Sequence, residues 1–296
     1  MLTGTFTALI TPFRRGGEID FAALKKIVEI QVQAGVEGLV PCGTTGESPT
    51  LSHEEHREVM ARVIEYAKSL NPQIIIIAGT GSNSTEEAIE LTRAAKQYGA
   101  DYSLQVNPYY NKPTQEGLYR HFMAISEAVD IPLVLYNIPG RTGVTLSLET
   151  IKRLCQNAQI AAIKEASGDL NFMTQIVLEV GSQVSLLSGD DNLLLPILSI
   201  GGRGVISVLS NLFPAETAAI TRAYLKGDLA KAQQLFLALF PLAKALFVET
   251  NPIPVKYAAS RLGLCENALR LPLVPLSEIH EKTLDEALEA AKQRLR

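Results

Sequence analysis

One lysine of this chain stands where its amine could act as a nucleophile. Lys164 ends the apolar stretch 160–164 and is followed by Glu165. A strand tip with apolar walls disfavours the ammonium form, which lowers the pKa and supplies the free amine that attacks a carbonyl to form an imine, or Schiff base. The residues themselves leave an alternative open, in which Lys164 pairs with Glu165 or extends its charged end into water.

Imine chemistry also needs groups that donate and accept protons near neutral pH. Tyr136 ends the preceding apolar stretch, and Thr44 and Thr45 stand between two glycines that permit close backbone approach to a small carboxylate. Arg141 follows a Pro-Gly pair, where a guanidinium could form two hydrogen bonds to a substrate carboxylate. A threonine pair between glycines is also common in turns, and a single arginine is usually a surface residue.

Eight short apolar stretches alternate with longer amphipathic ones, which is typical of repeated βα units. Six of the amphipathic stretches follow a residue suited to cap a helix: Asp20, Ser52, Ser84, Thr114, Ser147 and Asp169. Eight such units favour a closed (β/α)8 TIM barrel over an open sheet. The predicted strands are 5–10, 38–41, 74–78, 102–106, 133–136, 160–164, 184–187 and 204–207, and the predicted helices include 21–34, 54–70, 85–98, 115–129, 148–156 and 171–180.

The pattern changes after the eighth unit. Residues 228–248, 255–262 and 276–295 predict consecutive helices without intervening strands. The prolines of 251–254 cannot continue a helix and predict a fixed turn between them. We therefore predict two parts, a barrel catalytic domain over residues 1–225 and a C-terminal helical domain over residues 226–296.

The reactive residues end the predicted strands or follow them directly. In a barrel of this kind, chemistry gathers at the carboxyl ends of the strands, so these segments should meet at one face. The segments are 43–47, 107–113, 136–141, Lys164, 189–191 and 206–207.

The composition is that of a soluble globular enzyme. The chain has 296 residues, of which 47% are hydrophobic and 20% charged, with a formal net charge of -4. These values exclude the low hydrophobicity of disorder and the basic excess of nucleic-acid binders. Three widely spaced cysteines form neither a disulfide framework nor a CxxC metal site. With no signal-peptide pattern and no apolar stretch of ~18 residues, we expect a cytoplasmic protein.

Several of these motifs together resemble the pyruvate-dependent class I aldolase family, which includes the N-acetylneuraminate lyases. The resemblance rests on Gly43-Thr-Thr-Gly-Glu47, Tyr136-Asn-Ile-Pro139 and Ile163-Lys-Glu165, and it spans essentially the whole chain. Asn107-Pro-Tyr-Tyr-Asn-Lys-Pro113, together with Arg141 in its Pro-Gly-Arg-Thr-Gly context, resembles the synthase branch of the family more than the sugar-acid lyases.

The resemblance implies a reaction. Lys164 would condense with pyruvate, and the resulting enamine would attack the aldehyde of aspartate 4-semialdehyde, after which the product cyclises in lysine and diaminopimelate biosynthesis. Tyr136, Thr45 and Tyr110 would form a proton relay, with Tyr110 reaching in from a neighbouring subunit. The family is usually a homotetramer, a dimer of dimers, and its chemistry implies no separate cofactor and no metal.

The resemblance also implies which residues bind the substrates. Arg141 would hold the carboxylate of the semialdehyde, and Thr44 and Thr45 would meet the carboxylate of pyruvate. Gly189 and Ile206 would supply backbone groups to the pocket.

A regulatory site is implied as well. L-lysine would act as a feedback inhibitor at a dimer-interface site matched here by Ser48, Pro49, His53, His56, Asn83, Glu87 and Tyr109. Pro49 departs from the alanine common at that place, which puts the backbone contact of the loop in doubt but not the polar character of the site.

Other interpretations of the same residues compete with this one. His53 and His56 suggest zinc, but they are three apart rather than four and lack a third ligand, so a solvated helix face is the simpler interpretation. Gly79-Thr-Gly-Ser-Asn-Ser84 with Asp101 imitates a dinucleotide fingerprint, although the third glycine is missing and Asp101 precedes its strand. A sibling lyase acting on a sugar-derived keto acid remains an alternative, as does a silent barrel that senses a keto acid or amino acid.

Overall fold

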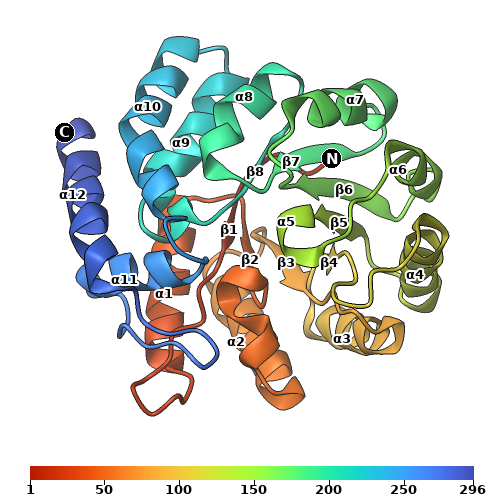
Figure 1. The fold of residues 1–296 in the computed structure, drawn as a ribbon, viewed down its shortest axis with the longest axis horizontal. Helices are drawn as coiled ribbons and strands as arrows, with labels where there is room; N and C mark the ends of the chain where they lie inside the picture. Colours follow the sequence, from red (N-terminus) through yellow and green to blue (C-terminus); the bar gives the residue numbers. More distant parts are fainter.

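The apolar stretches form eight parallel strands that close into a barrel, with helices around the outside (Figure 1). The computed structural model describes residues 1–296. Neighbours in sequence are neighbours in the sheet, and β1 pairs with both β2 and β8, which closes the ring. The predicted TIM barrel is therefore confirmed. The strands are β1 (Gly4–Ala8), β2 (Gly38–Val40), β3 (Ile75–Gly79), β4 (Tyr102–Val106), β5 (Leu133–Asn137), β6 (Ile160–Glu165), β7 (Ser185–Ser188) and β8 (Gly204–Ser207).

Six of the outer helices begin within one residue of their predicted starts. Each of the six predicted capping side chains accepts a hydrogen bond from a backbone N–H of the first turn that follows it, and Ser52 forms a reciprocal capping box with Glu55. The helices are α1 (Phe21–Ala34), α2 (His53–Leu70), α3 (Thr85–Tyr98), α4 (Gln115–Ala128), α6 (Leu148–Leu154), α7 (Leu170–Val180) and α9 (Pro214–Leu225).

Short elements lie at the carboxyl ends of the strands, where periodicity could not reveal them because each is shorter than two helical turns. They are the helices α5 (Pro139–Thr142) and α8 (Leu194–Ser199) and the 3-10 turns η1 (Thr44–Gly46), η2 (Ser48–Thr50), η3 (Asp191–Leu193) and η4 (Leu209–Asn211). These elements shape the loops that carry the reactive residues.

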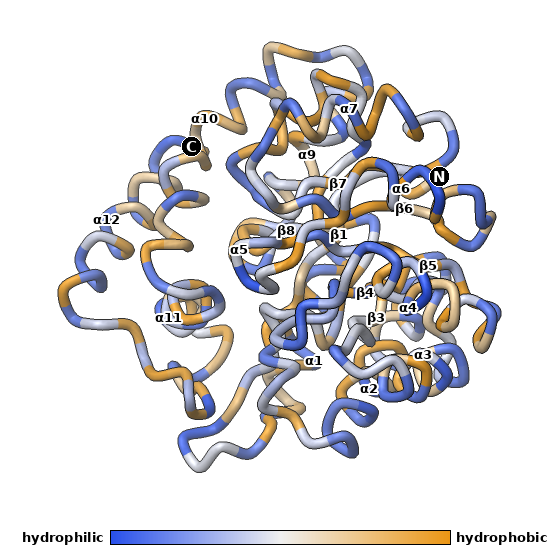
Figure 2. The backbone as a smooth tube through the Cα atoms, turned by 45° about the vertical axis from the view of Figure 1, so that its right-hand side comes forward, coloured by the Kyte–Doolittle hydropathy of each residue, from blue (hydrophilic) through white to orange (hydrophobic).

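The barrel interior is packed rather than hollow. A cluster of 11 buried residues that includes Phe6, Ile77, Leu187 and Tyr136 fills it. A larger cluster of 43 buried residues lies between the strands and the helices on one side of the barrel. Along the backbone, hydrophobic residues recur in the strands and alternate with hydrophilic ones in the surrounding helices (Figure 2). Because the interior is filled, the open space for chemistry lies at the strand ends.

The C-terminal extension packs beside one flank of the barrel (Figure 1). It consists of α10 (Leu229–Ala245), α11 (Ile253–Arg261) and α12 (Glu278–Arg294), and α10 contacts both α9 and α12. Its apolar residues join the 43-residue cluster that also holds β1 neighbours such as Leu9. The predicted end of the barrel, residue 225, is the last residue of α9. None of the helices combines the length and hydropathy that a membrane span requires.

One prediction for the extension is confirmed for one proline and wrong for the other. The sequence predicts that the prolines at 251–254 form a turn between helices. Pro252 lies in that turn, whereas Pro254 lies in the first turn of α11. Proline is tolerated there because a first-turn N–H has no helical partner to lose. The segment therefore separates two helices and also starts the second one.

Candidate active site

Lys164 and Tyr136 lie side by side at the ends of neighbouring strands. They are cross-strand partners in the pairing of β5 with β6. Lys164 is 6% exposed and Tyr136 is 5% exposed. The Lys164 Nζ lies 4.0 Å from the centroid of the Tyr136 ring. The amine and the phenol therefore share one nearly water-free position at the mouth of the barrel.

Burial lowers the pKa of Lys164 to about 8, although the carboxylates of Asp190 and Asp191 act to raise it. Desolvation penalises the ammonium form, as the sequence predicts. The interpretation of Lys164 as a partner of Glu165 is wrong, because the Glu165 carboxylate accepts hydrogen bonds from Asn137 Nδ2 at 2.8 Å and from the backbone N–H of Ser167 at 2.7 Å. An amine in this state is available as a nucleophile near neutral pH.

The two threonines of η1 face different groups. Burial raises the pKa of Tyr136, and a hydrogen bond with the Thr44 side chain acts in the opposite direction. Thr45 is 4% exposed, and its Oγ1 accepts a hydrogen bond from Asn251 Nδ2 at 2.9 Å. Successive residues of a 3-10 turn point about 120° apart, so the two side chains leave the backbone in different directions. Thr44 is therefore the threonine whose side chain acts on the Tyr136 phenol, whereas Thr45 contacts the C-terminal extension through Asn251.

Gly189 packs directly against Lys164. A side chain there would begin 2.6 Å from Ala166 Cβ and 3.2 Å from Lys164 Cε, so only glycine leaves the lysine its position. Ile206 is fully buried in the barrel interior, on β8. Both residues lie at or just after the carboxyl ends of their strands, β7 and β8.

Arg141 lies in α5, on the loop after β5. Its Nη2 donates a hydrogen bond to the backbone oxygen of Asn251 at 2.9 Å. Its positive charge also acts to lower the pKa of both Tyr136 and Lys164. The guanidinium is therefore close enough to influence the reacting groups while its side chain remains open to solvent.

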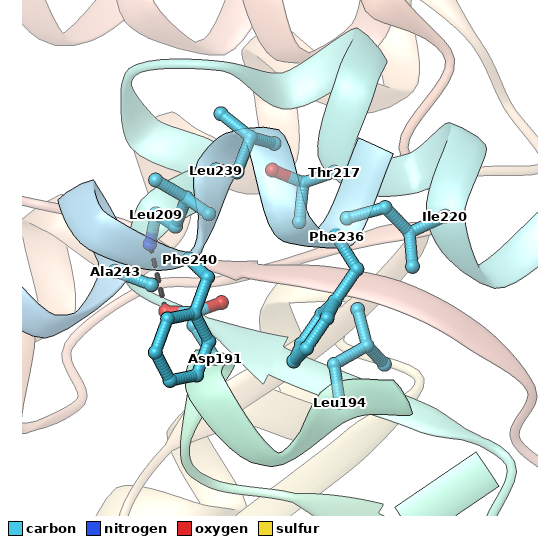
Figure 3. A pocket seen from close by; sticks show the side chains of 9 residues that line it. All are labelled: Asp191, Leu194, Leu209, Thr217, Ile220, Phe236, Leu239, Phe240 and Ala243. Carbon is cyan, nitrogen blue, oxygen red and sulfur yellow. Dashed lines mark hydrogen bonds between the residues drawn. The ribbon is translucent and has the colours of Figure 1, made fainter. Parts of the chain in front are cut away.

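Two acids after β7 have a role that sequence analysis missed. Asp191 Oδ2 accepts backbone hydrogen bonds from Val208 and Leu209, each at 2.9 Å, which joins the loop after β7 to the end of β8. Figure 3 shows the bond from Leu209. Burial raises the pKa of both Asp190 and Asp191. The signal in the sequence is a pair of adjacent acids directly after an apolar strand.

Asp191 also borders an apolar cavity of about 10 Å³, which holds one water molecule at most (Figure 3).

Tyr110 does not join the other site residues of its own chain. Its side chain is 91% exposed, and its φ of 72° holds it in the left-handed region within the loop after β4. A positive φ is uncommon for a residue other than glycine.

A second, polar cavity lies beside the loop of η1 and η2. It has a volume of about 180 Å³, and six of the seven residues expected to bind lysine line it: Ser48, Pro49, His53, His56, Glu87 and Tyr109. The seventh, Asn83, donates a hydrogen bond from Nδ2 to the Tyr109 backbone oxygen at 3.2 Å. The structure therefore brings the predicted regulatory residues together.

The two histidines of this cavity differ in environment. His53 Nε2 lies 2.7 Å from Glu87 Oε1 and is largely exposed, whereas His56 is 6% exposed and donates from Nε2 to the Gly79 backbone oxygen at 2.7 Å. Burial lowers the pKa of His56. The solvated helix face therefore describes His53 only, and no group of three or more potential metal ligands includes either residue.

The dinucleotide interpretation fails on geometry. The Gly79–Ser84 segment follows a strand of a closed barrel rather than of an open sheet. Asp101 accepts a hydrogen bond from the Ile76 backbone N–H at 2.8 Å and forms an ion pair with Lys68 at 3.0 Å. The acid therefore secures the start of β3, at the opposite end of the barrel from the reactive lysine.

Comparison with known proteins agrees with this geometry. Residues 1–291 match the model of the dihydrodipicolinate synthetase family. The 4-hydroxy-tetrahydrodipicolinate synthase of Leptospira biflexa serovar Patoc is 54% identical over 278 residues, covering 94% of this chain and 93% of the relative. The structure of the corresponding synthase from Methylacidiphilum fumariolicum SolV matches with a TM-score of 0.97 at 48% identity, covering 100% of this chain and 97% of that one.

Two similar structures are described with ligands. The dihydrodipicolinate synthase of Acinetobacter baumannii, complexed with pyruvate, has a TM-score of 0.95 at 44% identity and covers 99% of each chain. The enzyme from Cyanidioschyzon merolae, with lysine bound, has a TM-score of 0.93 at 40% identity and covers 98% of each chain. The chain therefore belongs to the dihydrodipicolinate synthetase family.

Proposed function

We propose that this protein condenses pyruvate with aspartate 4-semialdehyde to 4-hydroxy-tetrahydrodipicolinate, in lysine and diaminopimelate biosynthesis. The observation that carries the proposal is the buried Lys164 amine, with its pKa lowered to about 8, beside Tyr136. The names of the relatives favour the synthase over a sugar-acid lyase. A silent sensor would have no need of a desolvated nucleophile next to a phenol.

The first half of the reaction makes an enamine. The Lys164 amine attacks the ketone carbon of pyruvate, and the carbinolamine loses water to give the imine. Loss of a methyl proton then converts the imine to the enamine. The imine itself withdraws the electrons for this step, so the chemistry needs no separate cofactor.

The second half makes a carbon–carbon bond and a ring. The enamine carbon attacks the aldehyde of the semialdehyde, whose oxygen takes up a proton and becomes the hydroxyl of the product. The amino group of the semialdehyde then replaces Lys164 at the imine carbon, which closes the ring and frees the enzyme. One water is released overall, in the dehydration of the carbinolamine.

Protons would pass through hydroxyl groups at the site. The raised pKa of Tyr136 keeps its phenol protonated, so it acts as a donor and as one member of a relay rather than as a free base. Its hydrogen bond with Thr44 supports Thr44 as the second member, in place of the expected Thr45. The exposure of Tyr110 supports its entry into the site of a second copy of the chain, within a tetramer built as a dimer of dimers.

The remaining residues would hold the substrates. Thr45, with the backbone around it, would meet the pyruvate carboxylate, and Arg141 would bind the carboxylate of the semialdehyde. Gly189 and Ile206 would line the pocket with backbone. Three free cysteines, two of them buried, are compatible with the reducing cytoplasm as the site of the reaction.

Lysine would regulate the enzyme from the polar cavity. The Glu87 carboxylate, with His53 beside it, suits the ammonium groups of an amino acid, and the relative from C. merolae is described with lysine bound. Polar groups line the cavity, and its volume of about 180 Å³ is large enough for an amino acid.

Mass spectrometry of the products tests the proposed activity. Purified protein is incubated with pyruvate and aspartate semialdehyde, and separately with N-acetylneuraminate. We expect the cyclic condensation product in the first mixture and no cleavage in the second. Cleavage of the sugar acid without condensation would assign the chain to the lyase branch.

A further inference from the structure

A residue of the C-terminal extension joins two loops of the active site. Asn251, just before α11, donates from Nδ2 to Thr45 Oγ1 at 2.9 Å, although the two residues are 206 positions apart. Its backbone oxygen accepts the hydrogen bond from Arg141 Nη2 at 2.9 Å, across 110 positions. We propose that Asn251 is a positioning residue whose side chain orients the Thr45 hydroxyl toward the carboxylate of pyruvate. This inference rests on the proposed roles of Thr45 and Arg141.

The sense of the hydrogen bond determines what Thr45 can offer. A hydroxyl group has one hydrogen to donate and two lone pairs to accept with. Because the Asn251 amide occupies a lone pair, the hydroxyl hydrogen of Thr45 remains free to donate. A substrate carboxylate only accepts hydrogen bonds, so this is the orientation that binds it. Asn251 is 5% exposed, which holds the amide in place.

The loop that carries Thr45 needs contacts from outside, because its own hydrogen bonds stabilise it only weakly. η1 is a 3-10 turn of three residues, and turns of this kind have poor internal hydrogen-bond geometry. The Thr11 hydroxyl donates to the Gly46 backbone oxygen at 2.7 Å and holds the turn from the barrel side. Asn251 holds it from the side of the extension.

The extension also secures the far end of the same loop. Lys256 Nζ of α11 lies 2.5 Å from Glu47 Oε1, and both side chains are 0% exposed. Glu47 Oε2 further accepts a hydrogen bond from the Arg270 backbone N–H at 3.2 Å. With both Thr45 and Glu47 held from the extension, this part of the chain helps to form the substrate site in addition to covering the core.

The two contacts of Asn251 predict an unequal effect on the two substrates. The contact with Thr45 uses the side chain, whereas the contact with Arg141 uses the backbone. Asn251→Ala therefore removes the first and keeps the second. Loss of one hydrogen bond should raise the KM for pyruvate about five- to tenfold, with the KM for aspartate semialdehyde nearly unchanged and most of kcat retained.

Steady-state kinetics, with each substrate varied in turn, compares the KM values of the parent and the Asn251→Ala variant. Thr250→Ala is the matched control, because Thr250 is the exposed neighbour of Asn251 and its side chain forms no hydrogen bond. We expect parental KM values for this control. The pyruvate concentration that half-saturates borohydride trapping, a measurement without the second substrate, should rise for Asn251→Ala by the same factor as the KM.

If the Asn251→Ala variant does not fold, Asn251→Asp tests the inference instead. The side chain keeps its size, but the Thr45 hydroxyl would now donate to the new carboxylate, which also repels the pyruvate anion. The KM for pyruvate should then rise by more than tenfold. Equal changes in both KM values, or an unchanged pyruvate KM in a folded variant, would overturn the inference. A parent protein without condensation activity would instead overturn the proposed function.

Discussion

Imine formation needs the unprotonated amine of Lys164, so its rate should depend on pH. A change of pH is therefore the most direct way to perturb the site. With a pKa of about 8, about a tenth of the amine is unprotonated at pH 7. At the ordinary value of 10.5, the free fraction would be smaller by a factor on the order of 300. Because the pKa is lowered, the reactive form appears as pH rises through about 8, and the rate should reach its plateau above that value.

The rate of borohydride trapping at low pyruvate concentration, measured from pH 6 to pH 10, reports this ionisation. We predict a tenfold rise per pH unit below the midpoint and a flat profile above it. Asp190→Asn serves as the internal check, because the Asp190 carboxylate acts to raise the lysine pKa and its removal should move the midpoint to lower pH. A rate that still rises tenfold per unit beyond pH 9 would show that burial does not lower the pKa, and the reasoning would be refuted.

Three further predictions concern turnover, regulation and stability. Tyr136→Phe keeps the ring that packs against Lys164 but loses the hydroxyl. The kcat should therefore fall about 10²- to 10⁴-fold with little change in Tm. Near-parental turnover would refute the role of Tyr136 in the relay. Millimolar L-lysine should slow the parent enzyme. Glu87→Gln should raise the half-inhibiting concentration of lysine, because it removes the carboxylate that lines the cavity. Rates that lysine leaves unchanged would end the regulatory proposal. Lys256→Met leaves the Glu47 carboxylate buried without its partner and should lower the free energy of unfolding by about 3–5 kcal/mol. In urea denaturation, the double variant with Glu47→Leu should recover more than half of the lost free energy of unfolding. If the effects of the two substitutions simply added, the coupling between Lys256 and Glu47 would be contradicted.

Local patterns in the sequence predicted most of the fold. Strand number, helix starts and capping residues depend on neighbours a few positions apart, and the capping side chains and apolar stretches indicate these directly. The contact between Lys164 and Tyr136 could also be predicted, because adjacent strands of a barrel bring their last residues together. The order of residues along the chain is therefore enough to identify the reactive pair.

The orientation of single side chains cannot be predicted in this way. Which of Thr44 and Thr45 faces Tyr136 depends on a 3-10 turn that composition does not reveal. The contact of Asn251 with Thr45 spans 206 positions and depends on how the extension packs, which no local pattern encodes. Contacts of this kind are set by tertiary packing.

The site of covalent attachment tests the central claim most directly. The protein is incubated with pyruvate, reduced with borohydride and measured by intact mass, and the same is done with Lys164→Ala. We predict that the parent gains one reduced pyruvyl group, located on Lys164 by peptide mapping, and that the variant gains none. A variant labelled as readily as the parent would place the nucleophile on another lysine and contradict the account.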